Sequence, residues 1–267
     1  MFIYFTYIPV LLILLLLFFI FFSFKKNISR KIFSFFILSI AIWVFTLIFA
    51  DSGKDYNTVL LWTRLAIAGP IIAIYLLVIF SFVFPSLKPK FTLKKAIYLS
   101  FPALVMLFFI NTNHNVESIT IERWGSNPQP GFLYNVLLIY VVVYLIIALR
   151  NFYKSYKENT GIYKKQIVYL FIGLIFFIST AVFTNLLSIL FNFAQYSIYG
   201  PISSLFFIGC VGYAISRYRL MDIRIVLRKS MVMIAVLVTI VGGAGIITYA
   251  NSMYWNLMRP MWMGMLT

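Results

Sequence analysis

Side chains that carry out enzymatic chemistry are scarce in this sequence. Its 267 residues include one histidine, six acidic residues and one cysteine, which excludes an internal disulfide. P-loop, dinucleotide-binding, HExxH and GxSxG motifs are absent. His114 has Glu117 three residues further on, but its other neighbours are asparagines, which are poor ligands for a metal that needs three or four donors. We therefore expect no catalytic residues, no cofactor and no metal, and a solvent-exposed His114.

Charge is also scarce, and this excludes a soluble domain. Hydrophobic residues make up 63% of the chain and charged residues 10%, and the mean hydropathy is +0.99. A soluble fold of this composition would expose large apolar patches. The sequence therefore predicts an all-α, polytopic membrane helix bundle in the plasma membrane. Eight apolar runs are long enough to cross a bilayer, at 3–24, 32–50, 59–84, 96–110, 132–149, 167–191, 198–216 and 231–250.

Basic residues are distributed unevenly between the two sides of the predicted bundle. The segments 25–31, 86–95, 150–165 and 217–229 hold 18 of the 22 Lys and Arg residues. Basic loops stay on the cytoplasmic side during insertion, so we expect an N-terminus outside the cell. After the eighth span the C-terminus is expected outside as well. The net charge of +16 then indicates contact with anionic lipid and no nucleic acid.

The third apolar run and the fifth loop carry further predictions. Pro70 predicts a kink in the third run, because proline cannot donate a helical hydrogen bond. Arg64, near the outer end of the same run, is expected to anchor the helix at the lipid headgroups. The alternative for Arg64 is a buried cation that faces a ligand. Glu158 is expected to be a solvated partner of Lys154 or Lys157.

The longest polar interruption, at 111–132, lies on the expected outer side. Thr120 and Ile121 within it are expected to pair briefly as a strand. Uncharged polar residues also gather in and after the sixth run. The candidate ligand-binding residues are Asn185, Asn192, Gln195 and Tyr196. Together with the loop they predict a recognition site in the outer half of the bundle. The alternative is hydrogen bonding between helices.

The stretch "AISRYRLMDIRIVLRKSMVM" at 214–233 places five basic residues and one acid between two apolar runs. On one continuous helix Arg217 and Arg224 share a face that meets anionic headgroups. Arg219 and Asp222 lie on the opposite side, three residues apart, where they can pair. We expect these four residues to form the exit by which a signal leaves the membrane. The alternative is a topology signal alone.

Two segments resemble a known family. They are "WTRLAIAGPIIAIYLLVIFSFVFP" at 62–85 and "YGPISSLFFIGCVGYAISRYRLMDIR" at 199–224. Both look like the seven-helix N-terminal sensor region of bacterial membrane histidine kinases. The resemblance implies a seven-helix sensor-like domain at 3–229, an additional helix and tail at 230–267, and a place in two-component signal transduction. No phosphoacceptor histidine follows Asp222, so no kinase activity is implied for the chain itself, which would be the N-terminal part of a kinase or the sensor for a separate one.

Two functions therefore remain. The first is a membrane sensor that detects a signal and relays it by helix movement to a kinase-like output protein or within a homo-oligomer. The second is a small transporter or channel for an uncharged or apolar solute, with a path between the bent third span and the polar sixth. The near absence of charge within the spans favours the sensor over an ion-coupled carrier.

Overall fold

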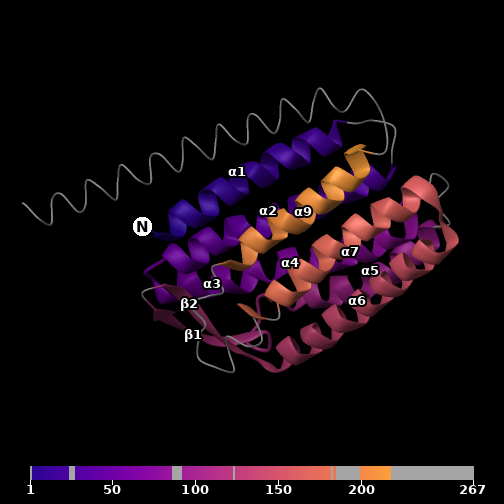
Figure 1. Cartoon of the computed structure of the whole chain (residues 1–267). Helices are drawn as coiled ribbons and strands as arrows, with labels where there is room; N and C mark the ends of the chain where they lie inside the picture. Colours follow the sequence, from indigo (N-terminus) through magenta and orange to yellow (C-terminus); the bar gives the residue numbers. More distant parts are fainter. Residues whose placement is uncertain are drawn as a thin grey trace, which may run out of the picture. The chain divides into compact units, whose positions relative to one another are not determined.

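Helices form from the apolar runs that were expected to cross the membrane. The computed structural model describes residues 2–23, 28–85, 92–122, 124–181, 183–184 and 199–217, so the eighth run lies outside the described residues. The helices are α1 (Phe2–Phe22), α2 (Ile28–Ser52), α3 (Tyr56–Ala66), α4 (Ala68–Val83), α5 (Leu93–Phe108), α6 (Phe132–Glu158), α7 (Gly161–Ala181) and α9 (Gly200–Arg217), and they pack side by side (Figure 1). The predicted all-α membrane helix bundle is thus confirmed.

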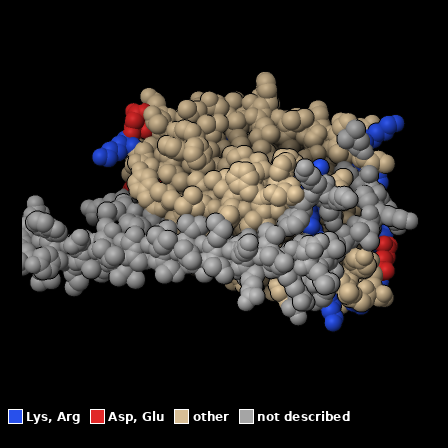
Figure 2. All heavy atoms as spheres, turned by 90° about the horizontal axis from the view of Figure 1, so that it is seen from above, with Lys and Arg blue, Asp and Glu red and all other residues tan. Residues whose placement is uncertain are grey.

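The apolar surface of the bundle is suited to contact with lipid. The helical stretches Ile28–Ser52, Tyr56–Val83, Phe132–Glu158 and Gly161–Ala181 are long and apolar enough to cross a bilayer. On α5, the large apolar side chains of Tyr98 and Phe108 are 79% and 81% exposed. On the face drawn in Figure 2, most of the visible charged side chains lie toward the two ends of the bundle, with an uncharged surface between them. This distribution fits a chain whose middle lies in hydrocarbon.

The third span is interrupted one turn before its proline. Helix α3 ends at Ala66 and α4 begins at Ala68, with Ile67 between them. Pro70 has no N–H to donate to the carbonyl of Ala66, which accounts for the break. Gly69 lies so close to α2 that an added Cβ would overlap Trp43. The interruption lies where the kink was predicted, and the angle between α3 and α4 stays a prediction.

Aromatic side chains form the core that joins the helices. Phe33 of α2 lies with its ring centroid 5.6 Å from that of Phe80 on α4, and Phe80 lies 6.2 Å from Phe152 on α6. Phe36, also on α2, contacts Phe207 of α9 at 5.6 Å. These contacts stabilise the bundle through dispersion and packing, because association of helices in lipid removes little apolar surface from water.

Helices α7 and α9 approach each other closely. An added Cβ on Gly173 would lie 2.8 Å from the Cβ of Cys210. Nearer the α6–α7 connection, the buried Gln166 donates from Nε2 to the carbonyl of Ala214 at 3.0 Å. Small residues at such positions let two backbones approach. Helices α7 and α9 are thus held close together at both positions.

Only Asn159 and Thr160 connect α6 to α7. The backbone N–H of Asn159 donates to the carbonyl of Ser155 at 3.1 Å, and its side-chain Nδ2 donates to the same oxygen at 2.7 Å. Gly161 then begins α7 with φ of +60°, a left-handed conformation that costs glycine little. The connection is thus a short, hydrogen-bonded turn.

A β-hairpin lies between α5 and α6, as the expected pairing at Thr120 and Ile121 requires. Strand β1 (Val116–Glu122) pairs antiparallel with β2 (Gly125–Pro130), and Ile121 lies opposite Ser126. Val116 and Ile119 pack against Val59 of α3 in a small cluster separate from the main core. We call this side of the bundle the hairpin end. The opposite side, where α6 ends, is called the basic end.

Candidate functional site

A carboxylate at the end of α2 holds the tip of the hairpin. The Oδ1 atom of Asp51 accepts hydrogen bonds from the backbone N–H and the hydroxyl of Ser126, both at 3.0 Å. Its Oδ2 atom accepts a hydrogen bond from the hydroxyl of Tyr7 in α1 at 2.8 Å. Among the described residues no Lys or Arg forms an ion pair with Asp51. Three hydrogen bonds therefore take the place of a counterion.

A buried arginine holds the base of the hairpin. Arg64, in the last turn of α3, is 8% exposed. Its Nε and Nη2 atoms donate to the carbonyl of Val116 at 3.2 and 2.8 Å, and Nη2 also donates to Oδ1 of Asn113 at 2.6 Å. The prediction that Arg64 anchors the helix at the headgroups is therefore wrong. The hairpin covers the guanidinium and provides neutral oxygen acceptors, so the side chain does not need to reach lipid.

The two contacts belong to one polar network. Thr63, which precedes Arg64, donates from its hydroxyl to that of Ser126 at 3.2 Å, and both hydroxyls are buried. The network thus joins α1, α2 and α3 to the tip and to the base of the hairpin. We call it the hairpin clasp; its members are Tyr7, Asp51, Thr63, Arg64, Asn113 and Ser126. It contains one acidic and one basic side chain, so its formal charge is balanced.

Glycine at the hairpin tip makes the contact with Asp51 possible. Gly125 has φ of +146°, and an added Cβ would lie 2.8 Å from Cγ and Oδ1 of Asp51. Any other residue would be strained at this φ and would push the carboxylate away from Ser126. The backbone conformation at Gly125 and the position of the Asp51 carboxylate therefore depend on each other.

The predicted ligand-binding residues Asn185, Asn192, Gln195 and Tyr196 lie outside the described residues. Their described neighbour Thr184 is buried and donates from its hydroxyl to the carbonyl of Thr180 at 2.9 Å. The polar part of the sixth run, from 185 onward, also lies outside the described residues. His114 is exposed, as predicted.

The predicted exit residues lie at and beyond the end of α9. Arg217 is the last residue of this helix. Its side chain, together with Arg219, Asp222 and Arg224, lies outside the described residues. Their proposed pairing and their faces stay predictions.

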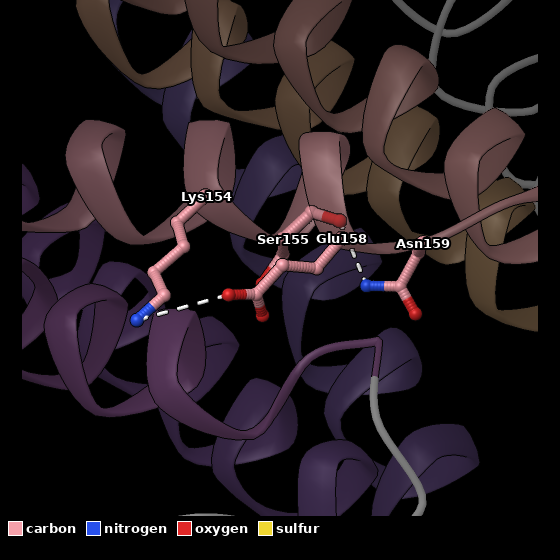
Figure 3. A network of polar contacts seen from close by, with 4 residues as sticks. All are labelled: Lys154, Ser155, Glu158 and Asn159. Atoms are coloured by element: carbon pink, nitrogen blue, oxygen red, sulfur yellow. Dashed lines mark hydrogen bonds and ion pairs between the residues drawn. The ribbon is translucent and has the colours of Figure 1, made fainter.

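The basic end contains the ion pair that was expected in the fifth loop. Nζ of Lys154 lies 3.7 Å from Oε1 of Glu158 one turn along α6, and both side chains are more than half exposed (Figure 3). Such an exposed pair contributes little stability, on the order of 0.3–0.5 kcal/mol. The predicted pairing of Glu158 with Lys154 is confirmed.

The clasp residues that sequence reasoning missed include Tyr7, Asp51, Thr63 and Ser126. Asp51 directly follows the second apolar run and is one of six acidic residues in the chain, which was the available signal. Neither Tyr7 nor Ser126 carried any signal. No group of three or more His, Cys, Asp or Glu side chains gathers for a metal within the described ranges.

Comparison with known proteins gives one finding. A family model described as the N-terminal 7TM region of histidine kinase matches residues 5–224. No curated protein and no solved structure matches the chain.

Proposed function

Because this chain belongs to the family of the N-terminal 7TM region of histidine kinase, we propose that it receives a signal at the hairpin end and relays it by helix movement to a kinase-type output. The hairpin clasp is the observation that carries this proposal. Its hydrogen bonds join the hairpin directly to α2 and α3, and Tyr7 of α1 is joined to it through Asp51. Hydrogen bonds of this kind are directional, so a bound molecule or a local change of charge can exchange one set of partners for another.

The small apolar support of the hairpin favours movement. Val116 and Ile119 pack on Val59 and do not belong to the main core. Of the hairpin, only the turn residue Trp124 packs against the main core, so displacing the two strands breaks few buried apolar contacts of the helices. The clasp then determines the position of the hairpin.

A packed route leads from the clasp toward the basic end. Asp51 and Phe36 lie on the same helix, and the Phe36 ring contacts Phe207 of α9. Helix α9 ends at Arg217, at the start of the proposed exit. We propose that Arg217, Arg219, Asp222 and Arg224 transmit the movement of α9 to a kinase-like partner protein, an attached output domain or a second copy of the chain.

The predicted recognition residues belong to the same proposal. The four candidate residues follow the C-terminal end of α7 in sequence, and this end is the one distant from the basic end. They are Asn185, Asn192, Gln195 and Tyr196. We propose that they contribute to a signal site near the hairpin end. We also propose a sensor domain at 3–229 and an additional helix and tail at 230–267.

A chimera tests the relay. Residues 1–224 are joined to a kinase core that lacks its own sensor, and its autophosphorylation rate is measured in membrane vesicles. We expect Asp51→Asn to change this rate by about fivefold or more, the lower range of allosteric coupling. Asp55→Asn is the matched control, because Asp55 is exposed and lies four residues away. An unchanged rate in Asp51→Asn, with hydrogen exchange showing a loosened hairpin, would contradict the relay.

A further inference from the structure

Three cations share one face of α6 at the basic end. Arg150, Lys154 and Lys157 are spaced four and three residues apart, so they follow one another along the same side of the helix, and all three are exposed. They line an open groove of about 610 Å³, whose other lining residues include Ile147 and Tyr153.

The groove carries excess positive charge. Its one carboxylate, Glu158, pairs with Lys154 at 3.7 Å. Nζ of Lys157 lies 4.8 Å from the centre of the Tyr153 ring, which orients the ammonium group. Two cationic charges remain uncompensated by the described lining residues, and they have the chemistry to hold a phosphate.

The cationic face continues directly into an apolar one. Ile139, Val143 and Ile146 precede Arg150 at the same alternating spacing of four and three residues. All three are exposed, at 64%, 45% and 58%. One side of α6 is therefore apolar within the membrane and cationic where the helix leaves it. Its pattern matches an amphiphile with a phosphate at one end and hydrocarbon chains at the other.

We propose that this groove is a binding site for an anionic phospholipid. The phosphate contacts Arg150 and Lys157, with Lys154 beside it, and an acyl chain lies along Ile146, Val143 and Ile139. Arginine suits this role because its planar fork of N–H donors matches phosphate oxygens. Charge complementarity and the continuous apolar stripe together favour a lipid over free phosphate.

Native mass spectrometry of the purified full chain tests the proposal. Phosphatidylglycerol and phosphatidylcholine with identical acyl chains are titrated, and the apparent affinity of the first adduct is compared. We expect tighter binding of phosphatidylglycerol. The triple variant Arg150→Gln, Lys154→Gln, Lys157→Gln should lose at least about tenfold of this affinity, because each basic residue near an anionic headgroup contributes about fivefold and Lys154 is already paired.

A second triple variant controls for overall charge. Lys94→Gln, Lys95→Gln, Lys165→Gln removes the same number of exposed cations from helix ends, and we expect it to retain wild-type preference. Equal losses in the two variants, or equal binding of the two lipids by the wild type, would overturn the proposal. Competition by soluble glycerol phosphate at similar concentration would also overturn it, since the site would then recognise free phosphate. Circular dichroism and gel filtration establish that both variants are folded.

Discussion

At the scale of single residues, the hydrogen bonds of Asp51 lead to a first prediction. In Asp51→Asn the side chain keeps its shape but exchanges one acceptor oxygen for a donor NH₂ group. The variant then lacks an acceptor for Tyr7 or for Ser126. We expect a loss of about 1–3 kcal/mol of stability, the cost of leaving a buried polar group unsatisfied. Thermal unfolding in detergent, followed by the helical circular dichroism signal, measures this loss of stability.

The control for this prediction is Asp55→Asn. Asp55 is the N-cap of α3, and asparagine caps a helix about as well as aspartate. Equal thermal midpoints for the two variants would mean that the Asp51 contacts do not stabilise the bundle.

Asp55 leads to a prediction about pH. The backbone N–H and the hydroxyl of Thr58 donate to its carboxylate and lower the pKa of Asp55 below its usual value. A carboxyl whose pKa is lower in the folded chain stabilises the helix start above the unfolded pKa, and this contribution is lost as the pH falls through the folded pKa. We therefore expect amide exchange at the start of α3 to accelerate, relative to its intrinsic rate, only below about pH 4.

In Asp55→Asn the start of α3 should show no such dependence on pH. Hydrogen exchange of a peptide spanning Tyr56 to Val59 is the measurement. A wild-type acceleration near neutral pH would contradict the assignment to Asp55.

At the scale of elements, two glycines in the paired helices α7 and α9 should respond in opposite ways. The Cβ of Gly173→Ala would lie 2.8 Å from that of Cys210, so the helices must separate, at a cost of about 1–3 kcal/mol. Gly209→Ala meets no described atom within 4 Å and should be neutral or stabilise α9 by up to about 1 kcal/mol. Thermal unfolding of both variants is the comparison. A neutral Gly173→Ala would mean that α7 and α9 are not held at this distance.

Local sequence patterns predict the elements of this fold better than its polar contacts. The length of each apolar run predicts a span, and Pro70 predicts the break near Ile67. Both predictions succeed because each depends only on residues within one segment. The position of Arg64 could not be inferred in the same way. Its acceptor at Val116 lies 52 residues away and is a backbone carbonyl, which no pattern of side chains reveals.

The same reasoning explains the clasp residues that were missed. Asp51 meets Tyr7 and Ser126 at separations of 44 and 75 residues. A carboxylate beside an apolar run has the same local sequence whether it meets solvent or a hairpin. Only the tertiary arrangement distinguishes the two cases. The candidate site could therefore be identified only from the structure, whereas the spans could be predicted from the sequence.

At the scale of the whole molecule, the distribution of basic residues predicts the orientation of the bundle. Single cysteines at His114 and Lys165, both exposed, are introduced into a Cys210→Ser background. We expect a membrane-impermeant thiol reagent to label position 114 in intact cells and position 165 only after the membrane is breached. The reverse pattern would place the hairpin end inside.

Catalysis is a second question for the whole molecule. We expect the purified chain to incorporate no phosphate from labelled ATP, since the family region matched here is a sensor region. The chimera with a kinase core is the positive control. Phosphate bound to His114 would contradict this expectation.

The short connection between α6 and α7 has a mechanical consequence. Helix α6 has 27 residues and is about 40 Å long, whereas two connecting residues span roughly 7 Å when fully extended. So short a connection leaves the adjoining ends of α6 and α7 little freedom to move apart. We therefore expect a tilt or axial shift of α6, such as a change in bilayer thickness imposes on a long span, to pull α7 with it. Under the proposed relay we expect this strain to reach α9 through the close contact at Gly173, which would make the thickness of the surrounding bilayer an input to the end of the bundle at Arg217.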